Sequence, residues 1–255
     1  MKLSIDKLSY GYKDKKVLDG VGFEAVDGRC LFLLGRNGVG KTTLLKCIGG
    51  LIRCDGEAVT DDGNGNKVNI LKLNNTRRAK IIGYVPQTVV FPPMSVYDTI
   101  LLGRLPHIRW GASEQDFAVT EEVITKLDLG EVAMRNVCAL SGGEKQKVAI
   151  ARALAQQAKV LLLDEPTSNL DIKNQLDVLE FLRHITVQND LITIAVVHDL
   201  QLALSSADDV VLLDEGKVYK SGLASEINEN DIKTVFGVDV KILRDGNKSL
   251  IAYSK

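Results

Sequence analysis

The chain has 255 residues, with 32 basic and 33 acidic side chains, a net charge of −1 and a hydrophobic fraction of 45%. Its length suits one large domain or two small ones, and its composition excludes intrinsic disorder, which requires low hydrophobicity and high net charge. Because the two signs of charge are balanced, we expect no broad basic face and no nucleic acid among the partners.

No part of the sequence is apolar over a length that could cross a membrane. The longest unbroken apolar run is residues 30–34, whereas a spanning helix needs about 20 apolar residues. Residues 1–6 include Lys2, Ser4 and Asp6 and do not form the apolar segment of a signal peptide. We therefore expect a cytoplasmic protein.

The first third of the chain is predicted to be rich in strands. Short strands are expected at residues 3–8 and 21–26, with a turn at 11–16 between them. The apolar run at 30–34 is typical of a buried strand in a parallel sheet, because both faces of such a strand are covered. The polar, glycine-containing residues 61–66 indicate the tip of a hairpin.

The middle of the chain, residues 95–157, is predicted to be mainly helical. Residues 113–116 resemble a capping box, and Phe117, Ile124 and Leu127 are expected on the apolar face of the helix that follows. This segment separates the strand-rich first part of the chain from a second group of strands.

The last part of the chain alternates strands and helices. Apolar runs at residues 160–163, 191–197 and 210–213 are expected to be buried strands, and residues 174–185 have the leucine spacing of a helix. Such alternation implies right-handed crossovers and a parallel core sheet. The sequence therefore predicts an α/β fold.

A phosphate-binding loop follows the strand at 30–34. The pattern G-x-x-x-x-G-K-[ST] is satisfied by residues 35–42, GRNGVGKT, which lead into a helical run. A helix N-terminus offers free N–H groups and a partial positive charge to phosphate, and glycine lets the backbone approach it closely. We expect Lys41 to reach the β- and γ-phosphates and the Thr42 hydroxyl to bind Mg²⁺.

Two carboxylates follow the predicted strand at 160–163. A buried strand would bring Asp164 and Glu165 to its carboxyl end, where ligands bind in parallel sheets. Asp164 is suited to hold Mg²⁺ or its waters, and Glu165 could act as the general base for an attacking water. A strand that ends in a solvated acidic turn is the alternative explanation, which the phosphate loop disfavours.

A second glycine-containing helix start lies at residues 140–146, LSGGEKQ. Ser141 and Glu144 have the spacing of a capping box, which is a purely structural explanation. A cap does not require Gly142 and Gly143, which lower helix stability in the first turn. We therefore favour an explanation in which an anion approaches this backbone.

In this order, the motifs resemble those of the ATP-binding cassette (ABC) family over nearly the whole chain. Residues 140–146 are similar to the signature motif of the family, residues 164–167 (DEPT) to the end of its Walker B motif, and residues 168–171 (SNLD) to its D-loop. Gln87 resembles the Q-loop glutamine, and His198 resembles the switch histidine.

Tyr12 lies where the family stacks an aromatic ring on adenine. Tyr10 and Tyr84 are also available for this role, and packing in a turn is an alternative explanation for Tyr12. His107 is expected to be non-catalytic, and Trp110 and the four cysteines are expected to pack against the fold.

The resemblance implies an ATPase with ATP and Mg²⁺ as cofactors. Each ATP lies between two cassettes arranged head to tail, and because the chain has one set of motifs, a homodimer is the simplest arrangement. The implied catalytic residues are Lys41, Gln87, Glu165 and His198. The implied ATP contacts within one chain are Tyr12, Asn37, Gly38, Val39, Gly40, Lys41, Thr42 and Thr43. The second chain would contribute Ser141, Gly142 and Gly143, with Asp171 at the interface, and the implied metal ligands are Thr42, Gln87 and Asp164.

The fold implied by the resemblance is a P-loop NTPase with a RecA-like, mostly parallel sheet. An antiparallel β subdomain is expected at the N-terminus, and a helical subdomain at about residues 88–158 is expected between the phosphate loop and Walker B halves. Residues 1–255 would then form one ABC ATP-binding domain.

ABC ATPases without membrane segments dock on transmembrane permease subunits, so the resemblance implies that partner and, indirectly, a substrate-binding protein. Residues 91–110 are the expected contact region, although a loop packed on its own core is the alternative. Within it, residues 102–107 (LGRLPH) resemble a Gly-Arg-x-Pro-His stretch of ATPases that serve importers of siderophores, haem and cobalamin. The chain is then expected on the inner face of the cell membrane, held there by the permease.

Two other functions compete with this hypothesis. One is a soluble ABC ATPase that assists iron–sulfur cluster assembly, which residues 102–107 disfavour. The other is a nucleic-acid-associated protein with tandem cassettes, which the single set of motifs disfavours.

Overall fold

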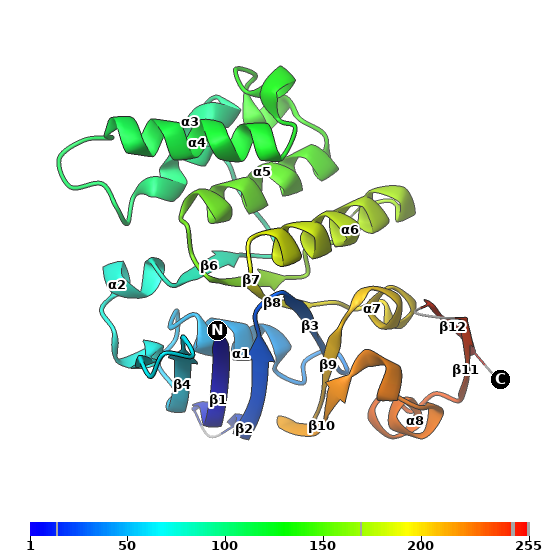
Figure 1. Cartoon of the computed structure of the whole chain (residues 1–255). Coiled ribbons are helices and arrows are strands. Elements are labelled where there is room, and N and C mark those ends of the chain that lie inside the picture. The colour runs from blue at the N-terminus through cyan, green and yellow to red at the C-terminus, as the bar shows by residue number, and fades with distance from the viewer. Residues whose placement is uncertain (14, 169, 246–247, 254–255) are drawn as a thin grey trace.

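Figure 1 shows the computed structural model of the chain, which describes residues 1–13, 15–168, 170–245 and 248–253. The main sheet has six strands in the order β10-β9-β3-β8-β7-β6, and every neighbouring pair is parallel except β9 with β10. Its strands are β3 (Arg29–Leu34), β6 (Ile82–Val85), β7 (Val160–Asp164), β8 (Ile192–Val196), β9 (Asp209–Asp214) and β10 (Lys217–Leu223). The predicted α/β fold with a mostly parallel sheet is therefore confirmed.

The N-terminal antiparallel sheet is also confirmed, but its first two strands are longer than predicted. Strands β1 (Lys2–Tyr12) and β2 (Lys15–Val26) pair as far as Tyr12 and Lys15, so the turn is shorter than the predicted 11–16. The register shifts three times along this ladder, and Lys7 has a φ of 49°, so the alternation that predicts a strand is interrupted. Strands β4 (Asp55–Asp61) and β5 (Lys67–Asn69) complete the sheet and form the predicted hairpin around residues 61–66.

Helices cover the main sheet and follow most of its strands. The α-helices are α1 (Lys41–Ile48), α2 (Asn75–Ala79), α3 (Val96–Leu101), α4 (Glu114–Lys126), α5 (Gly142–Ala155), α6 (Ile172–Gln188), α7 (Leu200–Ser206) and α8 (Glu229–Phe236). Short 3₁₀ turns are η1 (Ile70–Lys72), η2 (Leu102–Arg104), η3 (Gly130–Val132), η4 (Val137–Ala139) and η5 (Ala224–Glu226), and a hairpin of β11 (Val240–Asp245) and β12 (Lys248–Tyr253) follows α8.

Helices α3, α4 and α5 form a group of their own. They lie between β6 and β7 in the chain, and in Figure 1 they stand on the opposite side of these strands from β1, β2 and β4. These helices are the predicted helical insertion, whose limits at about residues 88–158 remain a prediction.

Strand β3 is buried on both faces and separates two hydrophobic cores. Phe32 and Leu34 lie in the core that is shared with α5, α6 and α7. Leu31 and Leu33 lie in the core that is shared with β1, β2 and α1. This double burial explains the continuous apolar run, and it fixes the strand end from which the phosphate loop begins.

Helix α4 begins where the sequence predicts, and two of the three residues predicted on its apolar face, Ile124 and Leu127, are buried. Ser113 and Asp116 form a complete capping box. Phe117 was predicted on the apolar face but is 40% exposed. The buried face consists of Asp116, Val119, Thr120, Val123 and Ile124, followed by Leu127. The prediction is wrong for Phe117 alone: in the first turn the buried position is taken by Asp116, a charged residue that pairs with Arg104.

The predicted packing roles of Trp110 and the cysteines have mixed outcomes. Trp110 is fully exposed, within residues 109–115, which are all exposed, so its packing role was predicted wrongly. Cys30 and Cys47 are buried, and burial raises the pKa of the Cys30 thiol to about 11, whereas Cys138 is exposed. Among the helices that the structure describes, none combines the length and the hydropathy of a membrane span.

Candidate functional site

The phosphate loop connects the end of β3 to the beginning of α1, as the sequence predicts. Gly40, immediately before α1, has a φ of 110°, and a Cβ atom there would lie 2.9 Å from the Leu18 side chain. A larger residue would therefore be strained both by its backbone conformation and by contact with β2. The loop is held against the antiparallel sheet at this point.

Lys41 is buried at the start of α1. Its ammonium donates hydrogen bonds to the carbonyl oxygens of Gly35 at 2.7 Å and Arg36 at 3.0 Å. Burial lowers the pKa of Lys41, and the negative charges of Glu165 and Asp164 act in the opposite direction. A cation in this position is suited to an anionic ligand in the loop.

Thr42 and Asp164 meet as the sequence predicts, and Tyr84 joins them. The Thr42 hydroxyl donates to Asp164 Oδ1 at 2.8 Å, and the Tyr84 hydroxyl donates to Asp164 Oδ2 at 3.3 Å. Burial and the Asp164 charge raise the pKa of Tyr84. Sequence reasoning missed this role, because a tyrosine in the β6 strand carries no motif, although pairing of β6 with β7 could have indicated it.

Glu165 is contacted by two of the other predicted catalytic residues, Gln87 and His198. Gln87 Nε2 donates to Glu165 Oε2 at 2.5 Å, and His198 Nε2 is hydrogen-bonded to Oε1. Glu165 has a φ of 52°, which is uncommon for a residue other than glycine and is often found at functional sites. The three side chains come from the chain segments that follow β6, β7 and β8, which are neighbours in the sheet.

A cavity of about 790 Å³ lies at the carboxyl ends of these strands. The predicted residues that line it are Asn37, Gly38, Gly40, Lys41, Thr42, Thr43, Gln87, Glu165 and His198. Val39 and Asp164 do not line it, although Asp164 reaches its wall through Thr42. Val17, Gly35, Arg36 and Phe236 also line it, and the sequence offered no motif for Val17 or Phe236.

Tyr12 does not line this cavity. It ends strand β1, its side chain is 66% exposed, and the Lys13 ammonium lies 6.0 Å from the centre of its ring. Its contact with adenine therefore remains a prediction. Neither of the two alternatives, Tyr10 and Tyr84, lines the cavity, and the Tyr84 hydroxyl donates to Asp164.

The signature segment is separate from the cavity. Ser141 caps α5: its hydroxyl accepts from the Glu144 N–H and donates to Glu144 Oε2 at 2.6 Å. Neither Ser141 nor the two glycines after it line the cavity. A Cβ atom on Gly143 would lie 3.0 Å from Asn174 Oδ1, so part of the need for glycine arises within the chain.

Asp171 caps α6 beside this segment. Its carboxylate accepts hydrogen bonds from the N–H of Asn174 at 2.8 Å and from the Asn174 side chain at 2.9 Å. The predicted D-loop also includes Asn169, which lies outside the described residues. The interface role of Asp171 therefore remains a prediction.

The predicted metal ligands fit a hard cation. Thr42 and Asp164 present oxygen atoms 2.8 Å apart at the junction of α1 and β7, and Gln87 lies on the adjacent strand end. Mg²⁺ commonly takes one or two protein carboxylates and completes its shell with substrate phosphates and water. This sparse oxygen donor set agrees with such a site.

Comparison with known proteins identifies relatives over almost the whole chain. Residues 18–168 match the family model described as ABC transporter. An uncharacterized ABC transporter ATP-binding protein of Methanocaldococcus jannaschii is 43% identical, over 95% of this chain and 94% of that protein. The iron(3+)-hydroxamate import ATP-binding protein of Bacillus subtilis is 34% identical, over 95% of this chain and 90% of that protein.

Two solved structures resemble this one in fold. A metal-chelate type ABC transporter in an inward-facing conformation has a TM-score of 0.82 and 27% identity, over 99% of this chain and 96% of that chain. A dimeric ATP-binding cassette in a post-hydrolysis state, bound to ADP and Pi, has a TM-score of 0.73 and 25% identity, over 87% of this chain and 98% of that chain.

Proposed function

Because the chain belongs to the ABC transporter family of ATP-binding proteins, we propose that it is the ATP-hydrolysing subunit of a metal-chelate importer. The observation that carries the ATP-hydrolysing part of this proposal is the convergence of six side chains at the carboxyl end of one sheet: Lys41, Thr42, Gln87, Asp164, Glu165 and His198. The phosphates of ATP would lie in the loop that precedes α1, and the γ-phosphate would face Glu165.

Hydrolysis requires an activated water beside the γ-phosphate. Glu165 accepts a proton from this water as its oxygen attacks phosphorus, the bond to the β–γ bridging oxygen breaks, and ADP and phosphate leave. Gln87 and His198 hold the two carboxylate oxygens of Glu165 and thereby orient it. Lys41 and the N–H groups of the loop bind the phosphate oxygens. Thr42, Asp164 and Gln87 would hold Mg²⁺, which neutralises phosphate charge when bound.

A second copy of the chain completes the site in this proposal. The first turn of α5, with Ser141, Gly142 and Gly143, is oriented as an anion-binding helix N-terminus but does not line the cavity of its own chain. In a head-to-tail dimer it would face the γ-phosphate of the other copy and stabilise the charge that develops there. The dimeric cassette with ADP and Pi, to which this chain is similar, supports this arrangement.

The proposed contact with a transmembrane permease lies in residues 91–110. Phe91 is buried and packs against Arg152, so the alternative of a loop packed on its own core holds for that residue. Leu105 is 60% exposed and Trp110 is fully exposed, and aromatic side chains such as that of Trp110 are enriched at protein interfaces. The chain would then lie on the inner face of the membrane through its permease.

The proposed class of transported substrate is inferred from similarity to known transport proteins, because no residue of this chain forms a site for that substrate in the proposal. The iron(3+)-hydroxamate import protein and the metal-chelate type transporter support a siderophore, haem or cobalamin type of metal chelate. The transported chelate would contact the permease and a substrate-binding protein, so the ATPase would sense it only indirectly.

Co-expression with candidate permeases tests this function. The expected result is that one permease co-purifies with the chain, stimulates its ATPase activity and allows a metal chelate to accumulate in membrane vesicles. A stable complex with soluble iron–sulfur assembly proteins, without stimulation by any permease, would contradict the proposal and favour the alternative.

A further inference from the structure

Residues 103–107 contact the C-terminal end of helix α5, which is the helix that begins with the signature segment. A Cβ atom on Gly103 would lie only 2.1 Å from the carbonyl oxygen of Arg152. Any other residue at position 103 would push the η2 turn away from α5. The glycine of this motif therefore permits a close contact between two backbones.

Arg104 and His107 bind carbonyl groups at the end of α5. Arg104 is 2% exposed, and its Nη1 donates to the Ala155 carbonyl at 2.7 Å and to Gln157 Oε1 at 2.9 Å. His107 Nε2 is hydrogen-bonded to the Gln156 carbonyl at 3.0 Å. The last carbonyls of a helix have no partner within the helix, and a cation is favoured near them. The two side chains therefore cap α5 from outside.

Asp116 holds Arg104 in this orientation. Arg104 Nε donates to Asp116 Oδ1 at 2.9 Å, and Asp116 Oδ2 accepts from the N–H of Ser113 at 2.9 Å. Both members of this ion pair are buried. The motif at residues 103–107, which resembles the metal-chelate subgroup, thus links the η2 turn and the first turn of α4 to the end of α5. Its charged residue, Arg104, is buried and is not part of the exposed surface.

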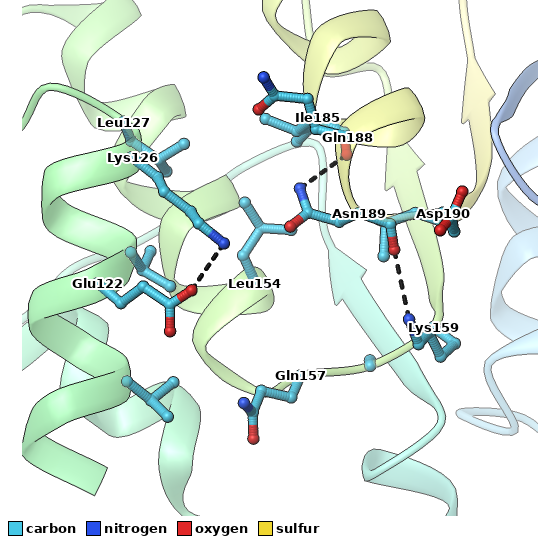
Figure 2. A pocket seen from close by; sticks show the side chains of 14 residues that line it. Glu122, Lys126, Leu127, Leu154, Gln157, Lys159, Ile185, Gln188, Asn189 and Asp190 are labelled. Atoms are coloured by element: carbon cyan, nitrogen blue, oxygen red, sulfur yellow. Dashed lines mark hydrogen bonds and ion pairs between the residues drawn. The ribbon is translucent and has the colours of Figure 1, made fainter. Parts of the chain in front are cut away.

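A cavity adjoins this contact between the helical group and the main sheet. It has a volume of about 380 Å³ and is lined by residues of α4, of the end of α5 and of the end of α6, including Gln157. Figure 2 shows Glu122 and Lys126 on one wall and Lys159 and Asn189 on the other. The polar contacts drawn there stay within their own wall, so no drawn hydrogen bond or ion pair crosses the cavity from α4 to the end of α6.

We propose that Arg104 and His107 are positioning residues for the signature helix. They fix the C-terminal end of α5, and this 14-residue helix, about 21 Å long, sets the place of Ser141 at its other end. Leu105, between them in the chain, is exposed in the proposed permease contact, so the same short segment contacts both that surface and the end of α5. This inference rests on the proposed function for its dimer and its permease.

ATP-dependent dimerisation of a Glu165→Gln parent tests the proposal without a permease. We expect either Arg104→Lys or His107→Ala, added to this parent, to weaken dimerisation about tenfold. Arg104→Lys loses the paired bonds that the guanidinium makes to Ala155 and Gln157, and His107→Ala loses the bond to the Gln156 carbonyl. The affinity of the monomer for ATP should not change, because Lys41 and its loop lie on other elements. His107→Gln retains a donor and should restore dimerisation, and His184→Ala, a change of an exposed histidine on α6, should have no effect.

The outcomes separate this proposal from the proposed function. Dimerisation that equals the parent in both variants would overturn the positioning role, as would a loss that merely follows a loss of ATP affinity. A parent that does not dimerise with ATP would contradict the proposed function, and with it the positioning role. Arg104→Lys keeps the charge beside Asp116, so a folded variant, verified by its thermal unfolding, is expected.

Discussion

The Thr42 hydroxyl donates a 2.8 Å hydrogen bond to Asp164 Oδ1, and thus joins the first turn of α1 to the end of β7. The two residues are 122 positions apart in the chain. This bond brings the phosphate loop and the two carboxylates into one site.

Glu165→Gln should bind ATP but hydrolyse it about 10²- to 10⁴-fold more slowly, because the general base is removed. Product formation under saturating ATP measures the rate, and equilibrium binding of ATP measures the affinity. Glu180→Gln, a change on α6 away from the cavity, is the matched control. Turnover at the wild-type rate in Glu165→Gln would exclude Glu165 as the base.

Lys41→Ala should lose most of its affinity for ATP, by at least about tenfold, because a charge-assisted contact to phosphate is removed. Lys46→Ala in the last turn of the same helix serves as the control and should bind ATP normally. Binding is measured directly by calorimetry. Equal affinity in the two variants would refute the placement of phosphate in this loop.

Tyr84→Phe should raise the Mg²⁺ concentration needed for half-maximal ATPase activity by about tenfold, because partners that orient a metal-ligating carboxylate affect metal affinity to this extent. ATP binding without Mg²⁺ should remain normal. Tyr97→Phe is the control, since Tyr97 packs against the helical core. An unchanged Mg²⁺ requirement would show that the Tyr84 bond does not orient Asp164.

Asp116 should contribute a pH-dependent part of the stability. The N–H and hydroxyl of Ser113, followed by Arg104, lower the pKa of Asp116 to about 2. A carboxylate with a lowered pKa stabilises the fold fully above its ordinary pKa, and this stabilisation is lost as the pH falls through the lowered value. The free energy of unfolding should therefore decline between about pH 4 and pH 2 by about 2 kcal/mol from this group.

Asp116→Asn checks this assignment by chemical denaturation at a series of pH values. The variant should be less stable by about 2 kcal/mol at neutral pH and should lack this part of the acid decline. Glu114→Gln, an exposed change in the same helix, is the comparison. A variant with the same acid decline as the wild type would show that the decline arises elsewhere.

Much of this site could be predicted from local sequence patterns. The phosphate loop, the acidic residues after β7 and the capped start of α5 each depend on neighbouring residues, whose spacing carries the signal. The family resemblance then supplied Gln87 and His198, which the structure places on Glu165. Spacing alone could not have predicted that Gln87 and His198 contact Glu165, because the parallel sheet brings together segments that are far apart in the chain.

The errors have physical causes of the same kind. Phe117 is predicted in the core because it is apolar, but in the first turn of α4 the buried position belongs to Asp116, which pairs with Arg104. Trp110 was predicted to pack for the same reason and is fully exposed. The role of Tyr84 and the cap formed by residues 103–107 depend on contacts between distant segments, which no local pattern indicates.

The central claim is that one ATP site is built from two copies of the chain, and mixing two inactive variants tests it most directly. Lys41→Ala removes the phosphate loop contact, and Ser141→Arg blocks the signature segment. In a mixed dimer, one site would combine the intact Lys41 of one copy with the intact Ser141 of the other, so random pairing leaves about one intact site in four.

The measurement is single-turnover ATP hydrolysis by each variant alone and by an equal mixture. We predict that the mixture hydrolyses ATP and that neither variant does so alone. A mixture as inactive as its components would contradict a site shared between two copies.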